Sequence, residues 1–534
     1  MVLTKAHNRM IQGSYVNVFD YGAVGDGTTD DTAALQAAIT AAAGNAVVIP
    51  DGNYLVTSTI TLSGCTIIGY GAKITSTVSN DDTLYGNTSN IKIYGLEIEG
   101  LGNSSYVAQE FLINIEGTNN DPSAPTFIEN VEIVDCYLHS VGRAAVRLKY
   151  AKNSKVCGNR IEDVGRSGVE AASVQYSEFN ENIVRGMSPG DGSNAYGIFL
   201  SKTDGSNTVE PQCLHCTVNG NIVEDNLIWE ALDTHGGEFI TFANNTIRNC
   251  KIGIALVSAD DGAGNGIPPK HCSVTGNVMQ GINRSGSAGS YGLNIAGESG
   301  LELENCSIVG NVIDAFGNQS GSTSGAIRLG SADNVVVSGN VVKRAGCNCI
   351  VLNSNVTNVN ISSNTLQDAW SDTEVARGIY VQASNNTGYI GNNTISRVTT
   401  GLGTNVMDRG VDFGTGSSNA FVTGPNRNTA TTPYANTGSS GILTVPTVQN
   451  GSETDTVSTG AATHTFSVTF PQAFNGNPRV VASTEQSPTG ANSVAVVSVT
   501  NVTTTGCDIV VATSDRANFG SAYTVSVYWI ATGF

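Results

Sequence analysis

Val218-Asn-Gly-Asn221-Ile-Val is one copy of a short segment that recurs through the middle of this 534-residue chain. Every copy has an apolar residue three positions before an asparagine and another apolar residue two positions after it. The average spacing of about 29 residues lies in the range of solenoid proteins, which stack one structural unit on the next. The nine asparagines are Asn159, Asn182, Asn221, Asn245, Asn277, Asn311, Asn340, Asn364 and Asn393.

A second motif follows most of these asparagines and reads small–apolar–x–apolar. Such alternation is typical of a short strand with one buried face. Short strands, a fixed period and almost no helical pattern predict an all-β parallel β-helix. One buried asparagine per turn would hydrogen-bond backbone at a bend and its neighbours in a ladder. The copies are Gly168-Val-Glu170-Ala, Gly197-Ile-Phe199-Leu, Ala231-Leu-Asp233-Thr, Gly253-Ile-Ala255-Leu, Gly292-Leu-Asn294-Ile, Ala326-Ile-Arg328-Leu and Gly378-Ile-Tyr380-Val.

These patterns divide the chain into four parts. Residues 1–45 are expected to hold a leader and a helix that caps the open end of the solenoid, because strong helix formers over 32–39 follow acidic capping residues. Residues 46–400 form the predicted β-helix, and residues 401–442, rich in Gly, Asn, Ser and Thr, a predicted connector. Residues 443–534 show the alternation of a small β-sandwich.

The charge balance limits the classes of partner. The chain has 26 Lys and Arg residues against 45 Asp and Glu residues, a formal net charge of −19. Nucleic-acid binding needs clustered basic residues, so we expect no nucleic-acid partner. No apolar run reaches the roughly 18 residues that suggest a membrane-spanning helix, so we expect no membrane insertion. The first residues lack the apolar core and cleavage site of a secretory signal, which argues against ordinary export.

The eleven cysteines are too sparse for a disulfide scaffold in a chain of this length. Cys216, Cys272 and Cys306 each stand five residues before a ladder asparagine, which predicts interior positions where a reduced cysteine packs as a small hydrophobe. The pairs around Cys213 and Cys347 lack the spacing of a complete zinc site. The sequence therefore predicts no metal, no other cofactor, and folding in a reducing cytosol.

Three segments carry a resemblance to known families. Tyr15-Val-Asn-Val-Phe-Asp20-Tyr-Gly-Ala-Val-Gly-Asp26-Gly-Thr-Thr-Asp30-Asp-Thr-Ala-Ala-Leu35, followed by Val48-Ile-Pro-Asp-Gly-Asn-Tyr54, resembles the opening of the pectate-lyase-like β-helix superfamily. Thr4-Lys-Ala-His-Asn-Arg-Met10 resembles the linker that precedes this domain in bacteriophage tail proteins. The last segment is similar to the H-type-lectin-like module that ends some phage tailspikes, where it would serve trimerisation or glycan binding.

The resemblance implies a right-handed parallel β-helix and a phage tailspike. Such a protein is a homotrimer that binds and usually cleaves a bacterial surface polysaccharide, either capsule or O-antigen. It would be made in the host cytoplasm, join other phage tail proteins in the virion tail, and act at the bacterial cell surface. The polygalacturonase constellation and the arginine motif of pectate lyases are absent from this sequence, so the resemblance assigns no catalytic residue directly.

The variable position x of each strand points outward, and successive rungs stack at about 4.8 Å, so these residues form columns. The stretch from Arg147 to His235 concentrates acidic, basic and aromatic side chains. The first column is Arg147, Glu170, Phe199, Asp233, Ala255, Asn294, Arg328, Val351 and Tyr380. The column two residues later is Lys149, Ala172, Ser201, His235, Val257 and Ala296.

The carboxylates in these columns suit glycoside hydrolysis. Glu170 and Asp233 lie two rungs apart, about 10 Å between backbones, and inverting glycosidases hold their carboxyl groups about 6.5–9.5 Å apart. We assign Asp233 as the base that activates water, and Glu170 or Glu230 as the acid. His235 is a further catalytic candidate, with a hydrogen bond to a loop as its alternative role.

Cations and aromatic residues near these carboxylates are candidates for substrate binding. Arg147 and Lys149 could hold an anionic sugar, while Phe199 and Trp229 could stack on sugar rings. Tyr380 is a further stacking candidate. Trp370-Ser-Asp372-Thr-Glu374 is a rival site on a loop, and Trp529 is expected in the core of the last domain.

The sequence supports three functions. The first is a metal-independent endoglycosidase that depolymerises capsule or O-antigen with paired carboxylates. The second is a polysaccharide lyase, in which His235 or a tyrosine acts as base and Arg147 or Lys149 neutralises a uronate. The third is a receptor-binding tail protein that binds glycan without cleaving it.

Overall fold

The computed structural model describes most of the chain and divides it into two compact units. The first comprises Met1–Thr387, Thr394–Asn419 and Asn428–Ser440, and the second comprises Gly388–Asn393, Ala420–Arg427 and Gly441–Phe534. The described residues are 15–103, 111–119, 121, 124–188, 194–202, 210–259, 266–282, 290–298, 300–318, 323–371, 374–382, 384–398, 405–414, 419–423, 426–430, 432–436, 441–444, 447–457, 463–471, 474, 477–484, 495–513 and 523–533.

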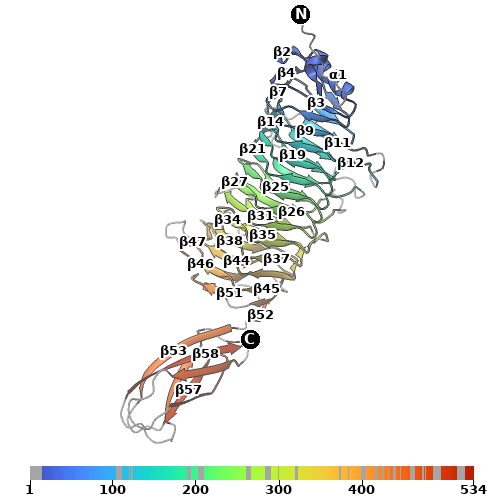
Figure 1. Cartoon of the computed structure of the whole chain (residues 1–534). Helices are drawn as coiled ribbons and strands as arrows, with labels where there is room; N and C mark the ends of the chain where they lie inside the picture. The colour runs from blue at the N-terminus through green and yellow to red at the C-terminus, as the bar shows by residue number, and fades with distance from the viewer. Residues whose placement is uncertain are drawn as a thin grey trace, which may run out of the picture. The chain divides into compact units, whose positions relative to one another are not determined.

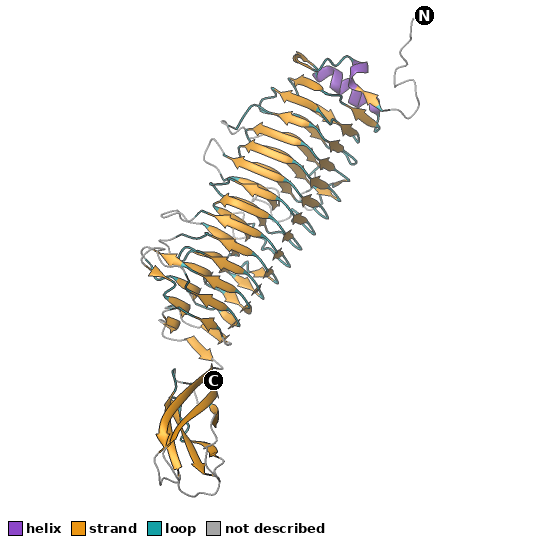
Figure 2. Ribbon diagram, turned by 60° about the vertical axis from the view of Figure 1, so that its left-hand side comes forward, coloured by secondary structure: helices purple, strands orange, loops and turns teal. Residues whose placement is uncertain are grey.

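Three long sheets of parallel strands form the β-helix, as Figures 1 and 2 show, and the predicted fold class is confirmed. Sheet A has 16 strands in the described part of the chain, and sheet B has 15. The strands of sheet A are β1 Val16–Asn17, β3 Ala46–Val48, β6 Thr66–Ile68, β9 Lys92–Tyr94, β13 Glu132–Val134, β17 Lys155–Cys157, β20 Glu178–Asn180, β23 Thr217–Asn219, β26 Thr241–Ala243, β29 Ser273–Thr275, β33 Ser307–Val309, β37 Val336–Ser338, β41 Val359–Ser362, β45 Thr387–Gly391, β49 Asn419–Thr423 and β52 Gly441–Thr444. The strands of sheet B are β2 Asp26–Asp30, β4 Gly52–Val56, β7 Ala72–Ser76, β10 Glu97–Glu99, β14 Tyr137–Val141, β18 Arg160–Val164, β21 Ile183–Met187, β24 Ile222–Glu224, β27 Thr246–Cys250, β30 Val278–Gly281, β34 Val312–Asp314, β38 Val341–Lys343, β42 Thr365–Gln367, β46 Thr394–Ser396 and β50 Arg427–Asn428.

Sheet C, with 14 strands among the described residues, contains every copy of the small–apolar–x–apolar motif. Its inward residues fill the core with Val, Ile and Leu side chains, while the x residues point outward. The strands are β5 Ile60–Leu62, β8 Leu84–Gly86, β11 Phe111–Glu116, β15 Ala144–Lys149, β19 Ser167–Ala172, β22 Tyr196–Ser201, β25 Glu230–His235, β28 Ile252–Val257, β31 Tyr291–Ala296, β35 Gly325–Gly330, β39 Asn348–Leu352, β44 Arg377–Val381, β48 Arg409–Phe413 and β51 Thr432–Asn436.

The predicted asparagine ladder is confirmed and lies in the turns between sheets A and B. Each turn from β9 to β46 has two residues, and from Asn159 onward the second of them is the ladder asparagine. The Asn221 Oδ1 accepts hydrogen bonds from the backbone N–H and the side-chain Nδ2 of Asn182, at 2.9 and 3.0 Å. The Asn221 Nδ2 donates to the Phe179 carbonyl at 2.8 Å. The buried amide is thereby satisfied on both its oxygen and its nitrogen.

The β-helix extends beyond the limits predicted for it, 46–400. Its first strands, β1 and β2, precede residue 46. Residues 401–442, predicted to be a connector, contain β48 and β51, which continue sheet C. The ladder also continues, because the Asn393 backbone N–H donates to Asn426 Oδ1 at 2.8 Å. These last rungs are hard to recognise in the sequence, because Asn426 has Thr423 and Asn428 at the two positions where the other ladder asparagines have apolar residues.

Connections of variable length lie along both borders of sheet C. The A-to-B turns are uniformly short, whereas several connections that enter or leave sheet C have eight or more residues. A solenoid accepts insertions at such borders without breaking its repeat, and these borders are where its binding surfaces form. Such connections run over residue numbers 100–110, 188–195, 202–216, 258–272, 282–290 and 315–324.

One helix, α1 Thr32–Ala42, lies at the end of the β-helix where the chain begins (Figure 1). It buries Leu35, Ala38 and Ile39 against the 3₁₀ turn Val18–Tyr21 and the first strands. Asp31 precedes the helix, but its carboxylate accepts from the backbone N–H groups of Val24 and Gly25 instead of capping the helix. Among the described residues no helix is long and apolar enough to cross a membrane.

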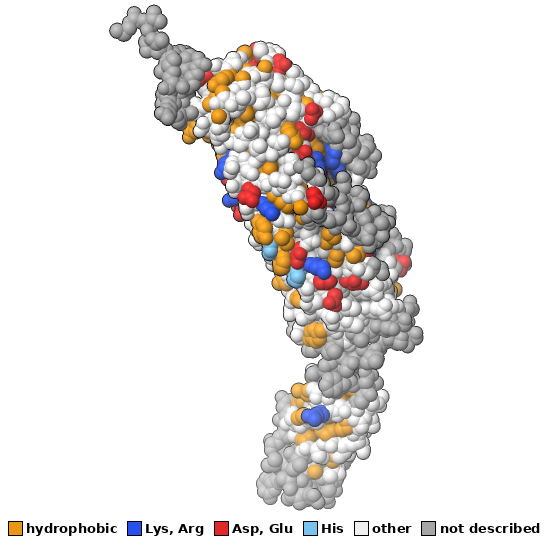
Figure 3. All heavy atoms as spheres, turned by 90° about the vertical axis from the view of Figure 1, so that its right-hand side faces the viewer, with side chains coloured by type: hydrophobic (Ala, Val, Ile, Leu, Met, Phe, Trp, Pro, Cys, Tyr) orange, Lys and Arg blue, Asp and Glu red, His pale blue; other side chains and the backbone are white. Residues whose placement is uncertain are grey.

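A stack of rings runs along the turns between sheets C and A. Tyr176, His215, Phe239 and His271 lie on four successive rungs, with centroids 5.2, 4.5 and 4.7 Å apart and interplanar angles of 9–19°. Hydrophobic and histidine side chains alternate along one face in Figure 3. All four residues have positive φ, a conformation that favours asparagine, and stacking offsets part of the cost.

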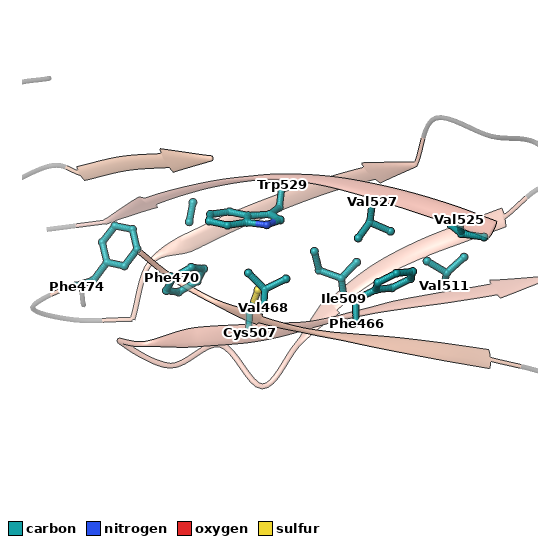
Figure 4. Close-up of a cluster of buried hydrophobic side chains, with 11 residues drawn as sticks. Phe466, Val468, Phe470, Phe474, Cys507, Ile509, Val511, Val525, Val527 and Trp529 are labelled. Carbon is teal, nitrogen blue, oxygen red and sulfur yellow. The ribbon is translucent and has the colours of Figure 1, made fainter. Parts of the chain in front are cut away.

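The second unit contains a β-sandwich of two antiparallel sheets, as predicted. Strands β53 Thr447–Val457, β58 Tyr523–Gly533 and β55 Arg479–Thr484 form one sheet. Strands β54 Thr463–Thr469, β57 Gly506–Thr513 and β56 Ala495–Thr500 form the other. Trp529 is 4% exposed and packs between the sheets with Phe470 and Ile509 (Figure 4), which confirms its predicted core position.

Replacing a ladder asparagine tests the structural role of the ladder. Asn221→Ala would leave the buried N–H groups of Asn182 and the Phe179 carbonyl without partners. Each unsatisfied group costs about 1–3 kcal/mol, so we expect a clear fall in the apparent unfolding temperature at a fixed scan rate. Asn360→Ala, on an exposed position of β41, is the matched control and should be near neutral. Equal unfolding temperatures for the two variants would contradict the ladder's role.

Candidate active site

Parallel strand pairing places the predicted columns in register. Arg147 pairs with Glu170, Glu170 with Phe199, and Phe199 with Asp233. His235 continues the second column from Ser201. The predicted columns are therefore confirmed as rows of neighbouring side chains on sheet C.

Strand β25 brings Glu230, Asp233 and His235 together. His235 Nε2 lies 2.8 Å from Asp233 Oδ2 and 4.0 Å from Glu230 Oε2. A regular strand would place residues three apart on opposite faces. The start of β25 departs from this alternation. The start of β22, one rung earlier, does the same, because the rings of Tyr196 and Phe199 lie 4.7 Å apart.

Burial makes this acid pair unusual. Asp233 is fully buried and Glu230 is 2% exposed. Burial raises the pKa of Glu230 well above its ordinary value, and the charge of Asp233 raises it further. Burial also raises the pKa of Asp233, while His235 opposes the rise. The two carboxyl groups thus differ in their tendency to hold a proton, which is the arrangement that acid–base catalysis needs.

His235 pairs with Asp233 and faces a small cavity. Burial lowers the pKa of His235, but the charge and hydrogen bond of Asp233 outweigh burial, so the net shift is upward. Burial and the two neighbouring carboxylates also raise the pKa of Tyr196. The cavity has a volume of about 180 Å³ and is lined by Arg166, Tyr196, Phe199, Ser201, Lys202, His235 and Ala259.

Glu170 belongs to a neighbouring cluster instead of the acid pair. Its Oε1 lies 3.5 Å from Arg147 Nε and 3.7 Å from Arg143 Nη2, and both guanidinium groups lie over the ring of Phe111. Phe199 occupies the rung between Glu170 and Asp233. Of the proposed acids, the structure therefore brings Glu230 to Asp233 and pairs Glu170 with arginines.

The predicted binding residues are only partly gathered around the cavity. Phe199 lines it, although the side chain is 7% exposed. Arg147 is engaged by Glu170, and the Lys149 ammonium lies 5.1 Å from the centroid of Tyr150. Trp229 adjoins Glu230 and lies under the Lys251 ammonium, 4.7 Å from its ring centroid.

Two other sequence-based candidates do not extend this site. Tyr380 is covered by Arg377, whose guanidinium carbon lies 3.9 Å from the ring centroid. In the rival loop, Trp370 and Glu374 are described, but Asp372 lies outside the described residues.

Several residues of the site were not predicted. Tyr196 stands just before the small residue of its motif, as Glu230 does, so this position was a usable signal. Arg166 and Lys202 lie in connections, where strand alternation gives no information.

Asp82, which lies before β8, is a buried acid outside this cavity. It is 7% exposed beside Asn114, and burial raises its pKa to about 6.

Glu230, Asp233 and His235 also have the chemistry of metal ligands. Among the described residues they form the one group in which three His, Cys, Asp or Glu side chains place ligand atoms within 4.8 Å of one another. Two carboxylates and an imidazole are donors that several divalent cations accept. The cysteine pairs considered from the sequence do not join such a group. The expectation of metal-independent chemistry stays a prediction.

Comparison with protein families places this site within a known domain type. Residues 15–277 match the family model described as rhamnogalacturonase A/epimerase, pectate lyase-like. The matched residues contain the acid pair, His235 and the whole cavity. Residues 465–532 match the H-type lectin domain, within the β-sandwich.

A curated relative matches part of the chain. A probable rhamnogalacturonase C of Aspergillus niger is 28% identical over 271 residues, which cover 44% of this chain. The match spans 57% of that relative's length. The similarity therefore covers less than half of this chain and little more than half of that relative.

Solved structures share the fold. The tailspike protein gp49 of Pseudomonas phage LKA1 has a TM-score of 0.57 and 14% identity, covering 97% of this chain and 100% of that one. A mutant tailspike of E. coli bacteriophage HK620, in complex with a hexasaccharide, has a TM-score of 0.58 and 14% identity, covering 99% and 96%. A GH87 alpha-1,3-glucanase of Streptomyces thermodiastaticus has a TM-score of 0.51 and 16% identity, covering 80% and 68%.

The raised pKa of Asp82 predicts a pH-dependent stability. The folded protein binds this proton up to about pH 6, whereas the unfolded chain releases it near pH 4, so stability falls as pH rises through this window. Asp82→Asn removes the effect. We expect the variant to gain about 1–3 kcal/mol relative to wild type between pH 4 and pH 7.5.

Thermal unfolding at both pH values measures this difference. The exposed Asp51, which does not contribute to the pKa of Asp82, offers a matched control, since Asp51→Asn should change the pH dependence little. A gain for Asp82→Asn that is the same at both pH values would contradict the assignment.

Proposed function

We propose that this chain is a phage tailspike depolymerase that binds and cleaves a bacterial surface polysaccharide, capsule or O-antigen, by endo-glycosidic hydrolysis. The buried pair of Glu230 and Asp233 carries the proposal. It lies on the sheet of the β-helix whose borders hold the long connections. The named relatives, a rhamnogalacturonase, a glucanase and a tailspike bound to a hexasaccharide, support a polysaccharide as substrate.

The two carboxyl groups have different roles in the proposed reaction. Glu230 holds its proton at neutral pH because burial and Asp233 raise its pKa, so Glu230 protonates the leaving oxygen as general acid. Asp233 keeps more of its charge beside His235 and activates water as base, or attacks the anomeric carbon itself. His235 positions the Asp233 carboxylate.

The product's anomeric configuration separates these two roles of Asp233. The ligand atoms of the acid pair lie within 4.8 Å, below the roughly 6.5–9.5 Å between carboxyl groups in inverting enzymes and nearer the roughly 5–5.5 Å of retaining ones. Retention indicates direct attack by Asp233. Inversion indicates an activated water, with either Glu230 or Glu170 as the acid.

A polysaccharide lyase is the second candidate. It needs an unprotonated base and a free cation for the uronate. The upward pKa shift of His235 leaves less of it unprotonated and available as base, and Arg147 is engaged by Glu170. These contacts favour hydrolysis. A non-catalytic receptor-binding protein would use the same surface without any requirement for a buried acid pair.

Assembly and location follow from the tailspike proposal. The chain would form a homotrimer, join other phage tail proteins in the virion, and act at the bacterial cell surface. The H-type lectin domain would contribute to trimerisation or bind glycan. Size measurement of the purified full chain, together with labelling in virions, tests this part of the proposal.

Substitution of the acid pair tests the proposed reaction. The full chain is incubated with a panel of capsular and O-antigen polysaccharides, and polymer mass, new reducing ends and unsaturated-uronate absorbance are followed. For the substrate found, Glu230→Gln and Asp233→Asn should each lower kcat by about 10²–10⁴-fold while binding persists. Glu170→Gln should cost less. Glu178→Gln, on exposed β20, is the matched control.

Each outcome of this panel separates the candidates. Reducing ends without absorbance indicate hydrolysis, whereas reducing ends with absorbance indicate a lyase. Binding without any fall in mass indicates the non-catalytic protein. Full activity in both Glu230→Gln and Asp233→Asn would place the active site elsewhere.

A further inference from the structure

Arg166 is a basic residue that lines the cavity beside the acid pair. It lies in the turn before β19, half-buried, and its guanidinium carbon stands 5.8 Å from the Phe199 ring centroid and 5.9 Å from that of Tyr196. Within the described parts of the chain its guanidinium forms no ion pair with a carboxylate. On sheet C, Arg147 is paired with Glu170 and Arg377 with Asp412, whereas Arg328 donates to the amide oxygen of Asn294.

The position of Arg166 connects it with the reaction. It lines the same cavity as Lys202 and His235, and His235 contacts Asp233. A sugar in this cavity would therefore be next to the sugar whose bond is cleaved, or would be that sugar itself. The charge of Arg166 also lowers the pKa of His235, in keeping with their proximity.

The charge of the cavity contrasts with that of the whole chain. The protein carries a formal net charge of −19 with 26 basic residues. Two of these basic residues, Arg166 and Lys202, nevertheless line a cavity of about 180 Å³. Holding a half-buried guanidinium without a partner costs free energy, whereas a bound carboxylate would offset the cost and accept two parallel hydrogen bonds.

We propose that this cavity is a subsite for an acidic sugar, a residue with a carboxylate such as a uronic acid, and that Arg166 is its specificity-determining residue. The inference rests on the proposed function and adds the class of substrate. The guanidinium pairs with the carboxylate, while Phe199 and Tyr196 pack against the apolar face of the ring. A neutral sugar of the same shape would leave the guanidinium unpaired.

Binding of monosaccharides tests the subsite without knowledge of the natural polysaccharide. The probes are sodium glucuronate and galacturonate, with methyl glucoside and methyl galactoside as neutral counterparts, titrated against the full chain by ligand-observed NMR. Wild type should bind a uronate about tenfold more tightly than its neutral counterpart. Arg166→Gln should lose this preference, and Arg166→Lys should keep part of it.

Arg160→Gln is the matched control, because Arg160 is exposed on sheet B and pairs with Glu162. It should bind like wild type, and all variants should unfold at similar temperatures. Equal binding of uronates and neutral sugars by wild type, no binding of either uronate, or unchanged uronate preference in Arg166→Gln would each overturn the proposal.

The outcome can be separated from that of the proposed function. Cleavage of a neutral polysaccharide through Glu230 and Asp233 would uphold hydrolysis and overturn the acidic subsite. Uronate binding that depends on Arg166, without cleavage of any polysaccharide, would uphold the subsite and count against the hydrolase.

Discussion

A ladder of buried asparagine amides sets the geometry on which the rest of the protein depends. From Asn159 onward each amide bonds to the next rung and to a backbone carbonyl, which stabilises the two-residue turns between sheets A and B. A fixed turn on one side of the solenoid holds the strands in register. Variation in loop length is thereby confined to the borders of sheet C, where insertions do not break the repeat.

The proposed active site depends on this register and on one local departure from it. Stacked strands place Arg147, Glu170, Phe199 and Asp233 in a row, but the acid pair itself forms within β25. The start of that strand brings Glu230 to the side of Asp233. Burial raises the pKa of both carboxyl groups, and His235 opposes the rise at Asp233. A rigid scaffold that holds two buried carboxyl groups with different pKa shifts is suited to acid–base catalysis.

The repeat and its outward columns could be predicted because both rest on a strict period of apolar and amide residues. The rungs after residue 400 could not, since Asn426 has Thr423 and Asn428 where the other copies have apolar residues, and loop-rich sequence surrounds the motif around Asp412. The closeness of Glu230 to Asp233 in the sequence suggested that they could pair. The strand pattern did not predict this contact, because regular alternation assigns the two residues to opposite faces. Arg166 lies in a turn, where no strand pattern applies, and the raised pKa of Asp82 depends mainly on its burial in the folded structure.

The most direct test of this account is a crystal structure of the Glu230→Gln protein with an oligosaccharide from the polysaccharide it processes. The account predicts that the sugar lies over β22 and β25. The glycosidic oxygen should be within hydrogen-bonding distance of residue 230, with the anomeric carbon beside Asp233. An oligosaccharide bound in a productive pose at another cluster, such as that of Glu170 and Arg147, would contradict the central claim that Glu230 and Asp233 perform the reaction.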